Sequence, residues 1–210
     1  MDNIRSLIKR YPVLESSYES IVKAKDALIR TFENDGTLLV CGNGGSCSDA
    51  EHILGELMKG FRKKRPLSDK QKSDLINNGG ALGESLAETL QQPLKTISLM
   101  GMPSLTTAFA NDVKYEFACA QMTLAYACKN STLLGISTSG NAENVLAAAV
   151  VAKMHGACTV GLTGADGGMM NTYFDILIKV PETETFKIQE LHLPVYHAIC
   201  LDIEEHFFKE

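Results

Sequence analysis

The stretch from Leu38 to Glu56, LLVCGNGGSCSDAEHILGE, constrains the fold more than any other part of the chain. Its pattern predicts a buried strand over 37–41, then a glycine-rich turn, then a helix that begins near Cys47. The glycines let a ligand approach the backbone, and the helix start offers unpaired N–H groups that suit a phosphate. His52 and Glu56 follow one to two turns further on, four residues apart, so their side chains project from one helix face. We therefore expect an anion cradle beside a proton-transfer pair, which is an enzyme's arrangement.

The remaining sequence alternates between strand and helix patterns. Strands are predicted at 94–99, 131–136, 158–162 and 175–180, and helices at 17–34, 103–109, 115–128, 145–154 and 185–208. Strands separated by helices at this spacing form a parallel sheet covered on both faces. The expected fold class is therefore α/β, a three-layer αβα sandwich with a five-stranded parallel sheet, built as a single domain over 1–210.

Composition narrows the class of protein. The chain is 45% hydrophobic with a formal net charge of -5, which fits a folded protein and gives no reason to expect nucleic acid as a partner. No apolar run approaches the ~18 residues of a membrane span, and the first residues lack the apolar core of a signal peptide. The six cysteines form no CxxC motif, so we expect reduced thiols in the cytoplasm. Cys47 is interpreted as a small packing residue.

The segment 62–92 interrupts the alternation. It opens with the charge run RKKR, which we interpret as a solvated face in preference to a substrate clamp. The leucines that follow predict short helices folded over the domain. An inserted segment of this length beside an active site would suit a lid or a subunit contact.

A second polar loop, STSGN at 137–141, directly follows the strand predicted at 131–136. Taken alone, it could simply cap a helix. Because both polar loops lie at carboxyl ends of strands, where ligands of parallel sheets bind, the pair favours a phosphate site. Neither loop contains GxxxxGK[ST] or GxGxxG, which argues against a nucleoside triphosphate and weakens a dinucleotide interpretation.

The closing helix carries Gln189, His192 and His197. These residues would form a zinc or proton-transfer cluster if the start of the helix packs against the first site. Helix geometry places Gln189 and His197 about 80° and ~12 Å apart, so one metal reaches both only with long side chains or a bend. Pro194 lies between them and predicts a kink. Taken alone, His52 and Glu56 could equally be an ordinary exposed pair.

Five motifs in order resemble the sugar isomerase (SIS) domain family: GNGGSCSDAEH with GE in the next turn, AND at 110–112, GISTSGN, LTGADGG and IQELHLPVYH. Within that family the likeness is greatest to the isomerases of seven-carbon sugar phosphates. The resemblance implies a flavodoxin-like SIS fold, a cytoplasmic homotetramer and active sites formed between subunits. It also implies an aldose–ketose isomerase that interconverts sedoheptulose 7-phosphate and D-glycero-D-manno-heptose 7-phosphate through an enediol.

The resemblance assigns roles to individual residues. Glu56 and His197 match the acid/base pair of the family, with Glu56 as base in the preferred order and the reverse order open. One zinc ion per subunit, which would stabilise the enediolate as a Lewis acid, is implied at His52, Glu56, Gln189 and His197. The positions implied in substrate binding are Asn43, Gly44, Gly45, Ser46, Glu56, Asn111, Asp112, Ser137, Thr138, Ser139 and Gln189.

Three departures leave the substrate open. Ala142 replaces a serine usual after STSGN, Phe186 stands where an acidic residue is common, and Gly60 stands where a basic residue is common. The alternatives are a non-catalytic relative that binds a replication initiator, a sugar-phosphate sensor, and an isomerase of another ketose phosphate. The presence of both Glu56 and His197 favours an enzyme over the first alternative.

Overall fold

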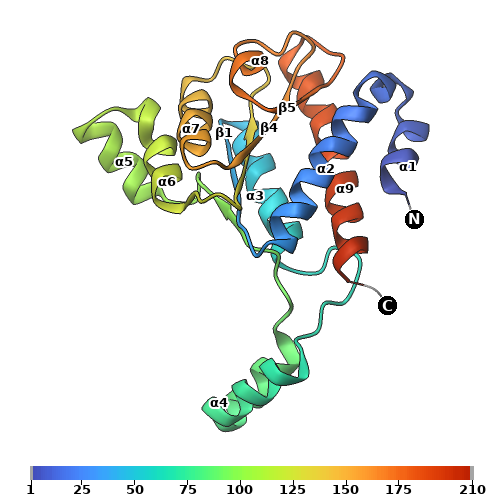
Figure 1. Ribbon diagram of the computed structural model, residues 1–210, viewed down its shortest axis with the longest axis vertical. Helices are drawn as coiled ribbons and strands as arrows, with labels where there is room; N and C mark the ends of the chain where they lie inside the picture. The colour runs from blue at the N-terminus through green and yellow to red at the C-terminus, as the bar shows by residue number, and fades with distance from the viewer. Residues whose placement is uncertain (1, 209–210) are drawn as a thin grey trace.

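Five parallel strands form the centre of the computed structural model, which describes residues 2–208 (Figure 1). They are β1 (Leu38–Gly42), β2 (Thr96–Ser98), β3 (Thr132–Ile136), β4 (Cys158–Thr163) and β5 (Ile176–Lys179), in the spatial order β2-β1-β3-β4-β5. The helices are α1 (Asn3–Arg10), α2 (Tyr18–Glu33), α3 (Gly45–Met58), α4 (Asp69–Thr89), α5 (Pro103–Asp112), α6 (Ala118–Tyr126), α7 (Glu143–Met154), α8 (Met170–Tyr173) and α9 (Thr185–Phe207), with 3₁₀ turns η1 (Pro12–Ser17) and η2 (Tyr115–Phe117). The predicted α/β class and its five-stranded parallel sheet are confirmed.

The sheet separates two apolar layers because successive strand side chains point to opposite faces. Leu38 and Val40 of β1 face the layer made by α1, α2, α3 and α9. Leu39 and Cys41 face the other layer, which includes α6, α7 and α8. All five residues of β1 are buried, as expected for a central strand of a covered parallel sheet.

This strand order creates a switch point between β1 and β3. The helix after β1, α3, packs on the α2 and α9 side, whereas the helix after β3, α7, packs on the α6 side. The connections therefore leave in opposite directions, which makes the carboxyl ends of these two strands the topological switch point, where ligands of open parallel sheets bind. The GNGGS and STSGN loops directly follow these two strands.

Two elements lie outside the sequence-based expectation. The helix α1, with Ile4 and Leu7 buried against the core, precedes the first helix that was predicted. A short α8 follows the turn at 164–168, and the helix predicted at 115–128 divides into η2 and α6. Helix α9 is one continuous helix, and Pro194 lies buried within it.

The inserted segment does form helices, but the expectation that they fold over the domain is wrong. Helix α4 bends back on itself at Gly80, whose φ of 52° and ψ of -130° favour glycine, and it projects away from the sheet (Figure 1). Its two arms pack on each other so closely that a Cβ at Gly83 would collide with the Leu75 carbonyl. The segment leaves and re-enters the body at one point, where Pro66 bridges to Gln91. The hairpin thus closes on itself and leaves Leu82 68% exposed.

Candidate active site

The glycine-rich loop joins β1 to α3 at the switch point. Gly44 has a φ of 55° and precedes the first residue of α3, Gly45. Asn43, Gly44 and Gly45 are exposed and Ser46 is buried. The Asn43 amide exchanges two hydrogen bonds, of 2.8 and 2.9 Å, with the amide of Asn144 at the start of α7. This pair ties the first loop to the helix that follows the second.

The second loop, 137–141, is held from the side by the segment 164–170. Asn141 accepts a hydrogen bond from the Met169 amide, and the Gly140 carbonyl accepts one from Met170. Ser137 is buried, Thr138 is partly buried and Ser139 is exposed, so the exposure of these three hydroxyl-bearing residues increases along the loop that leads into α7. This is a geometry suited to phosphate oxygens.

The Asn111–Asp112 pair ends α5, a helix without buried residues that stands away from the body (Figure 1). Both residues are exposed, and the Asn111 amide donates to the Asp112 carboxylate over 2.8 Å. Lys114, just beyond them, pairs with Glu143 at the start of α7 over 3.0 Å. The pair is therefore held near the start of α7, and within residues 2–208 it makes no hydrogen bond to either loop.

The acid/base candidates lie at the interface of α3 and α9. His52 Nε2 is 3.3 Å from Glu56 Oε1, and the Glu56 side chain is only 13% exposed. The His197 ring from α9 packs edge-on against His52, with ring centroids 4.9 Å apart. Two helices far apart in sequence thus bring a carboxylate and two imidazoles together.

This cluster is further from the loops than the sequence suggests. Because α3 begins at Gly45, Glu56 lies eleven residues, about 16 Å, along the helix axis. The sequence predicts one to two turns between the helix start and this pair, but Glu56 lies about three turns from the start of α3. Within one chain, the glycine-rich loop and Glu56 are therefore about three helical turns apart.

Two residues that the sequence did not single out anchor His52. Tyr196 lies 3.0 Å from His52 Nδ1 through its hydroxyl, which also donates to Asp49 Oδ1 over 3.2 Å. Asp49, His52 and Glu56 occupy one face of α3, so a continuous polar chain runs from Asp49 through Tyr196 and His52 to Glu56.

Burial controls the electrostatics of the two α9 histidines. Burial, with the neighbouring His52, lowers the pKa of His197, while Glu56 opposes the shift. Burial also lowers the pKa of His192 to about 4, and its backbone neighbour Thr163 offsets only part of this. Within residues 2–208, His197 Nε2 and both ring nitrogens of His192 make no hydrogen bond.

Gln189 is placed away from the histidines. Its side chain lies against Gly45, where a Cβ would collide with the Gln189 amide. The donor types proposed for zinc are present, but the Gln189 side chain contacts Gly45 at the start of α3, whereas Glu56 lies near the end of that helix. Within the described part of the chain, no group of three His, Cys, Asp or Glu side chains is arranged to hold a metal ion.

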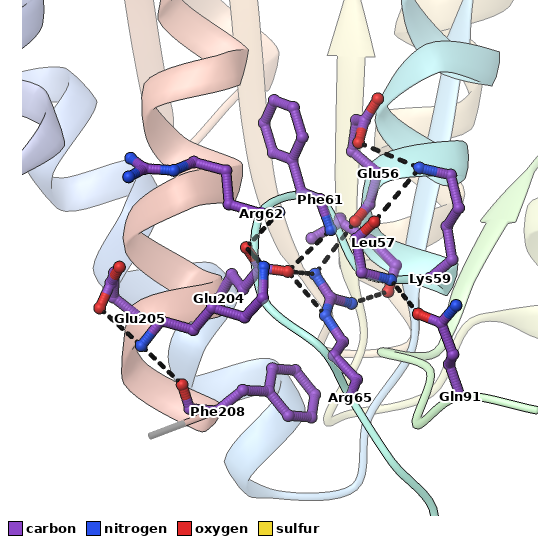
Figure 2. A network of polar contacts seen from close by, with 12 residues as sticks. Glu56, Leu57, Lys59, Phe61, Arg62, Arg65, Gln91, Glu204, Glu205 and Phe208 are labelled. Atoms are coloured by element: carbon purple, nitrogen blue, oxygen red, sulfur yellow. Dashed lines mark hydrogen bonds and ion pairs between the residues drawn. The ribbon is translucent and has the colours of Figure 1, made fainter. Parts of the chain in front are cut away.

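The charge run at 62–65 is only partly solvated, which corrects the sequence interpretation (Figure 2). Arg62 and Lys64 are exposed, but Arg65 is 1% exposed and pairs with Glu204 of α9 over 2.7 Å. Arg65 also donates to the carbonyls of Glu56 and Leu57, so it caps the carboxyl end of α3.

Glu204 completes this network by accepting backbone N–H bonds from residues 61–63 at 2.8 to 3.1 Å. The Arg65 guanidinium further stacks over the Phe208 ring at 4.6 Å. The network fixes the end of the helix that carries Glu56 to the helix that carries His197.

The sequence contains only weak indications that Tyr196, Arg65 and Asn144 make specific polar contacts. Tyr196 falls on an apolar stripe and is typical of a core residue, and Arg65 is one of four consecutive charges. Asn144 follows Glu143 in the polar first turn of α7, which is typical of an exposed helix start, so no pattern pointed to its contact with Asn43.

Comparison with known proteins agrees with this architecture. Residues 1–74 match the family model described as the SIS domain. The chain is 39% identical over 194 residues to the phosphoheptose isomerase of Helicobacter pylori strain Shi470, covering 92% of this chain and 88% of the relative. It is 34% identical over 197 residues to that of Roseiflexus sp. strain RS-1, covering 94% and 87%.

A solved structure of phosphoheptose isomerase from Neisseria gonorrhoeae superimposes with a TM-score of 0.75 at 28% identity, covering 96% of this chain and 94% of that one. Within residues 2–208, none of the helices has the length and apolar character needed to cross a membrane. The extent of identity along nearly the whole chain places it, by sequence and fold together, in the SIS-domain family, among the phosphoheptose isomerases.

Proposed function

We propose that this chain is a sugar-phosphate isomerase that interconverts sedoheptulose 7-phosphate and D-glycero-D-manno-heptose 7-phosphate in the cytoplasm. The observation that supports it most directly is the meeting of Glu56 and His197 across the α3–α9 interface, with His52 in contact with both. Membership among the phosphoheptose isomerases supports the choice of substrate.

The chemistry needs one base and one acid. The Glu56 carboxylate removes a proton from carbon 1, and the C–H electron pair becomes the double bond of the enediol. His197 gives a proton to the carbonyl oxygen at carbon 2. The carbon 1 hydroxyl then returns a proton to His197, and Glu56 delivers its proton to carbon 2, which completes the aldose.

Burial suits His197 to this role. Its lowered pKa leaves the imidazole largely neutral near pH 7. A neutral imidazole can stabilise a developing oxyanion through its N–H without adding a charge to the site. The reverse assignment, with His197 as base and Glu56 as acid, uses the same two groups.

We also propose that the site is completed between subunits of a homotetramer. The 137–139 hydroxyls would hold the phosphate, the exposed Asn43–Ser46 loop would line the pocket, and Asn111 with Asp112 would meet sugar hydroxyls. The separation of about 16 Å along α3 supports this division, because it places Glu56 about three turns from the glycine-rich loop of the same chain.

Zinc stays a proposal for the same cluster. His52, Glu56 and His197 would hold it, together with Gln189 only if that side chain leaves Gly45. The Gln189 side chain lies against Gly45 in this structure, and the acid–base steps use only Glu56 and His197. Metal analysis of the purified protein, with turnover before and after chelation, tests this proposal.

The function is tested by turnover of sedoheptulose 7-phosphate. Glu56→Gln and His197→Gln should each lower kcat by about 10²- to 10⁴-fold. The matched controls are Glu33→Gln and His206→Gln, which alter an exposed Glu–His pair 2.8 Å apart and should retain full activity. Normal turnover in both cluster variants would remove the assigned roles. Turnover of a different ketose phosphate alone would keep the reaction and replace the substrate.

Shared sites are tested by complementation. Glu56→Gln and Ser137→Ala subunits, each inactive alone, are mixed, dissociated and reassembled. Recovered activity is expected if one subunit supplies the phosphate loop and another supplies Glu56. If reassembly occurs without any recovery, each site belongs to one chain.

A further inference from the structure

Two side-chain hydrogen bonds join the glycine-rich loop to the segment that follows β3. The Asn43 amide donates to Asn144 Oδ1 over 2.8 Å, and the Asn144 amide donates to Asn43 Oδ1 over 2.9 Å. Within residues 2–208, no other hydrogen bond joins residues 43–46 to residues 137–144. Because β1 and β3 are neighbours with Gly42 opposite Ile136, the two loops leave the sheet side by side, and this amide pair bridges them.

Burial makes Asn144 the fixed member of the pair. It is 6% exposed in the first turn of α7, and its second amide hydrogen is directed to Cys119 Sγ at 3.6 Å. Both N–H groups of Asn144 therefore have partners within the protein. Asn43, in contrast, is exposed. A buried amide that loses its partner costs free energy, so Asn144 holds the Asn43 amide in one orientation.

The pairing leaves Asn43 with a defined capacity for a ligand. A primary amide has two N–H donors and two acceptor positions, and Asn144 occupies one of each. Asn43 keeps one N–H and one acceptor position, and neither is charged. This combination suits a hydroxyl group, which both donates and accepts, better than a phosphate dianion, which only accepts.

We propose that Asn144 is a positioning residue that holds the free N–H of Asn43 toward a hydroxyl of the sugar whose phosphate is bound at 137–139. This inference rests on the proposed isomerase function. Asn144 and the 137–139 hydroxyls belong to the same short segment at the start of α7, so the amide pair also fixes the spacing between the phosphate and that hydroxyl. Asn144 therefore acts on binding of the sugar part of the substrate and not on binding of its phosphate.

The first test does not depend on activity. In ¹⁵N spectra of the side-chain amides of the whole protein, Asn43 should have one slowly exchanging proton although the residue is exposed, with the signal identified by its loss in Asn43→Ala. Asn144→Leu should make both protons exchange rapidly. The matched control is Asn130→Leu, which should leave the Asn43 signals unchanged. The exposed Asn130 amide also joins two loops, by donating to the Asn34 carbonyl over 3.1 Å, but it does so before β1 and β3, at the opposite edge of the sheet.

The second test compares two ligands by calorimetry, in a Glu56→Gln background that prevents turnover. Asn144→Leu should weaken binding of sedoheptulose 7-phosphate by about 3- to 10-fold, as for one lost neutral hydrogen bond, and change binding of inorganic phosphate by less than about twofold. A variant that merely loosens the start of α7 would weaken both ligands alike, because the phosphate loop belongs to the same segment.

The third test asks whether Asn144 acts through Asn43. The double variant Asn43→Ala/Asn144→Ala should bind sedoheptulose 7-phosphate no more weakly than Asn43→Ala alone, because the side chain through which Asn144 acts is already missing. Asn144→Ala also provides an independent variant if Asn144→Leu folds poorly.

The outcomes separate this inference from the proposed function. Rapid exchange of both Asn43 amide protons in the wild-type protein, equal losses for the two ligands, or additive losses in the double variant overturns the positioning role. If the ligands separate as expected but the wild-type protein isomerises no ketose phosphate, the positioning role stands and the proposed function fails. If the wild-type protein binds no ketose phosphate, both fail.

Discussion

Helices α3 and α9 meet at two polar clusters that differ in how well their atoms are satisfied. In the scaffold cluster, Arg65 and Glu204 are buried, and Glu204 accepts from three backbone amides as well as from Arg65 (Figure 2). In the reaction cluster, about two turns away, His197 Nε2 and Asp49 Oδ2 have no partner within the described chain.

The contrast indicates which cluster holds the two helices together. Buried polar groups in folded proteins are nearly always paired, because an unpaired one costs about 1–3 kcal/mol. The scaffold cluster obeys that rule and fixes the interface. The reaction cluster departs from it at His197 Nε2 and Asp49 Oδ2, and the scaffold cluster lets the fold tolerate the departure.

Breaking the scaffold cluster should have the largest effect on stability. Arg65→Met leaves Glu204 buried without its cation and should lower the free energy of unfolding by about 3–5 kcal/mol. Denaturant unfolding measures this, and Arg62→Met, on an exposed neighbour, should change it by less than about 0.5 kcal/mol.

The double variant Arg65→Met/Glu204→Leu separates two explanations. Removing both charges often restores stability, but here three backbone N–H groups of residues 61–63 would lose their acceptor. We therefore expect the double variant to remain destabilised, and full recovery would show that the ion pair alone mattered.

Helix α9 also carries His192, which extends the comparison because it is fully buried and unpaired. Its pKa of about 4 in the folded protein lies below the ordinary value of 6.5, so folding favours the neutral form. This contribution is fully present above about pH 6.5 and is lost as the pH falls toward 4, by about 3 kcal/mol.

The measurement is the difference between the wild-type protein and His192→Met in denaturant unfolding at pH 7 and at pH 4. The wild-type protein should lose about 3 kcal/mol more than the variant over this range. An equal loss in the two proteins would show that carboxylates, not His192, control acid stability.

Substitutions in the reaction cluster should change the free energy of unfolding much less than substitutions in the scaffold cluster. Glu56→Gln and His197→Gln should keep the unfolding free energy within about 1 kcal/mol of the wild-type value, because neither removes a fully satisfied partner. A loss of 3 kcal/mol or more, on the scale of a broken buried ion pair, would mean that these groups hold the interface together.

Sequence patterns predicted the local features of this contrast better than the distant ones. Strand periodicity, glycines and the four-residue spacing of His52 and Glu56 are local, and the fold built from them is confirmed. Which members of a charge run become buried depends on the partner across the interface, so Arg65 was misinterpreted. Tyr196 likewise looks like any core aromatic, because its hydroxyl gains meaning only from Asp49 and His52. The direction of α4 depends on where its two ends leave the body, which no local pattern records.

Lys59 lies between the two clusters and gives the sharpest test of where one ends and the other begins. Its ammonium is 3.5 Å from Glu56 Oε2 and 3.3 Å from the Gly60 carbonyl, but its side chain is 59% exposed. Exposed ion pairs contribute about 0–1 kcal/mol and weaken with salt, so Lys59→Ala should change stability by less than about 0.5 kcal/mol. KM for the sugar phosphate should also stay within about twofold. A large rise in KM that disappears in Lys59→Arg would instead mean that this cation contacts substrate. The reaction cluster would then extend to the carboxyl end of α3, and the boundary with the scaffold cluster would fall between Lys59 and Arg65.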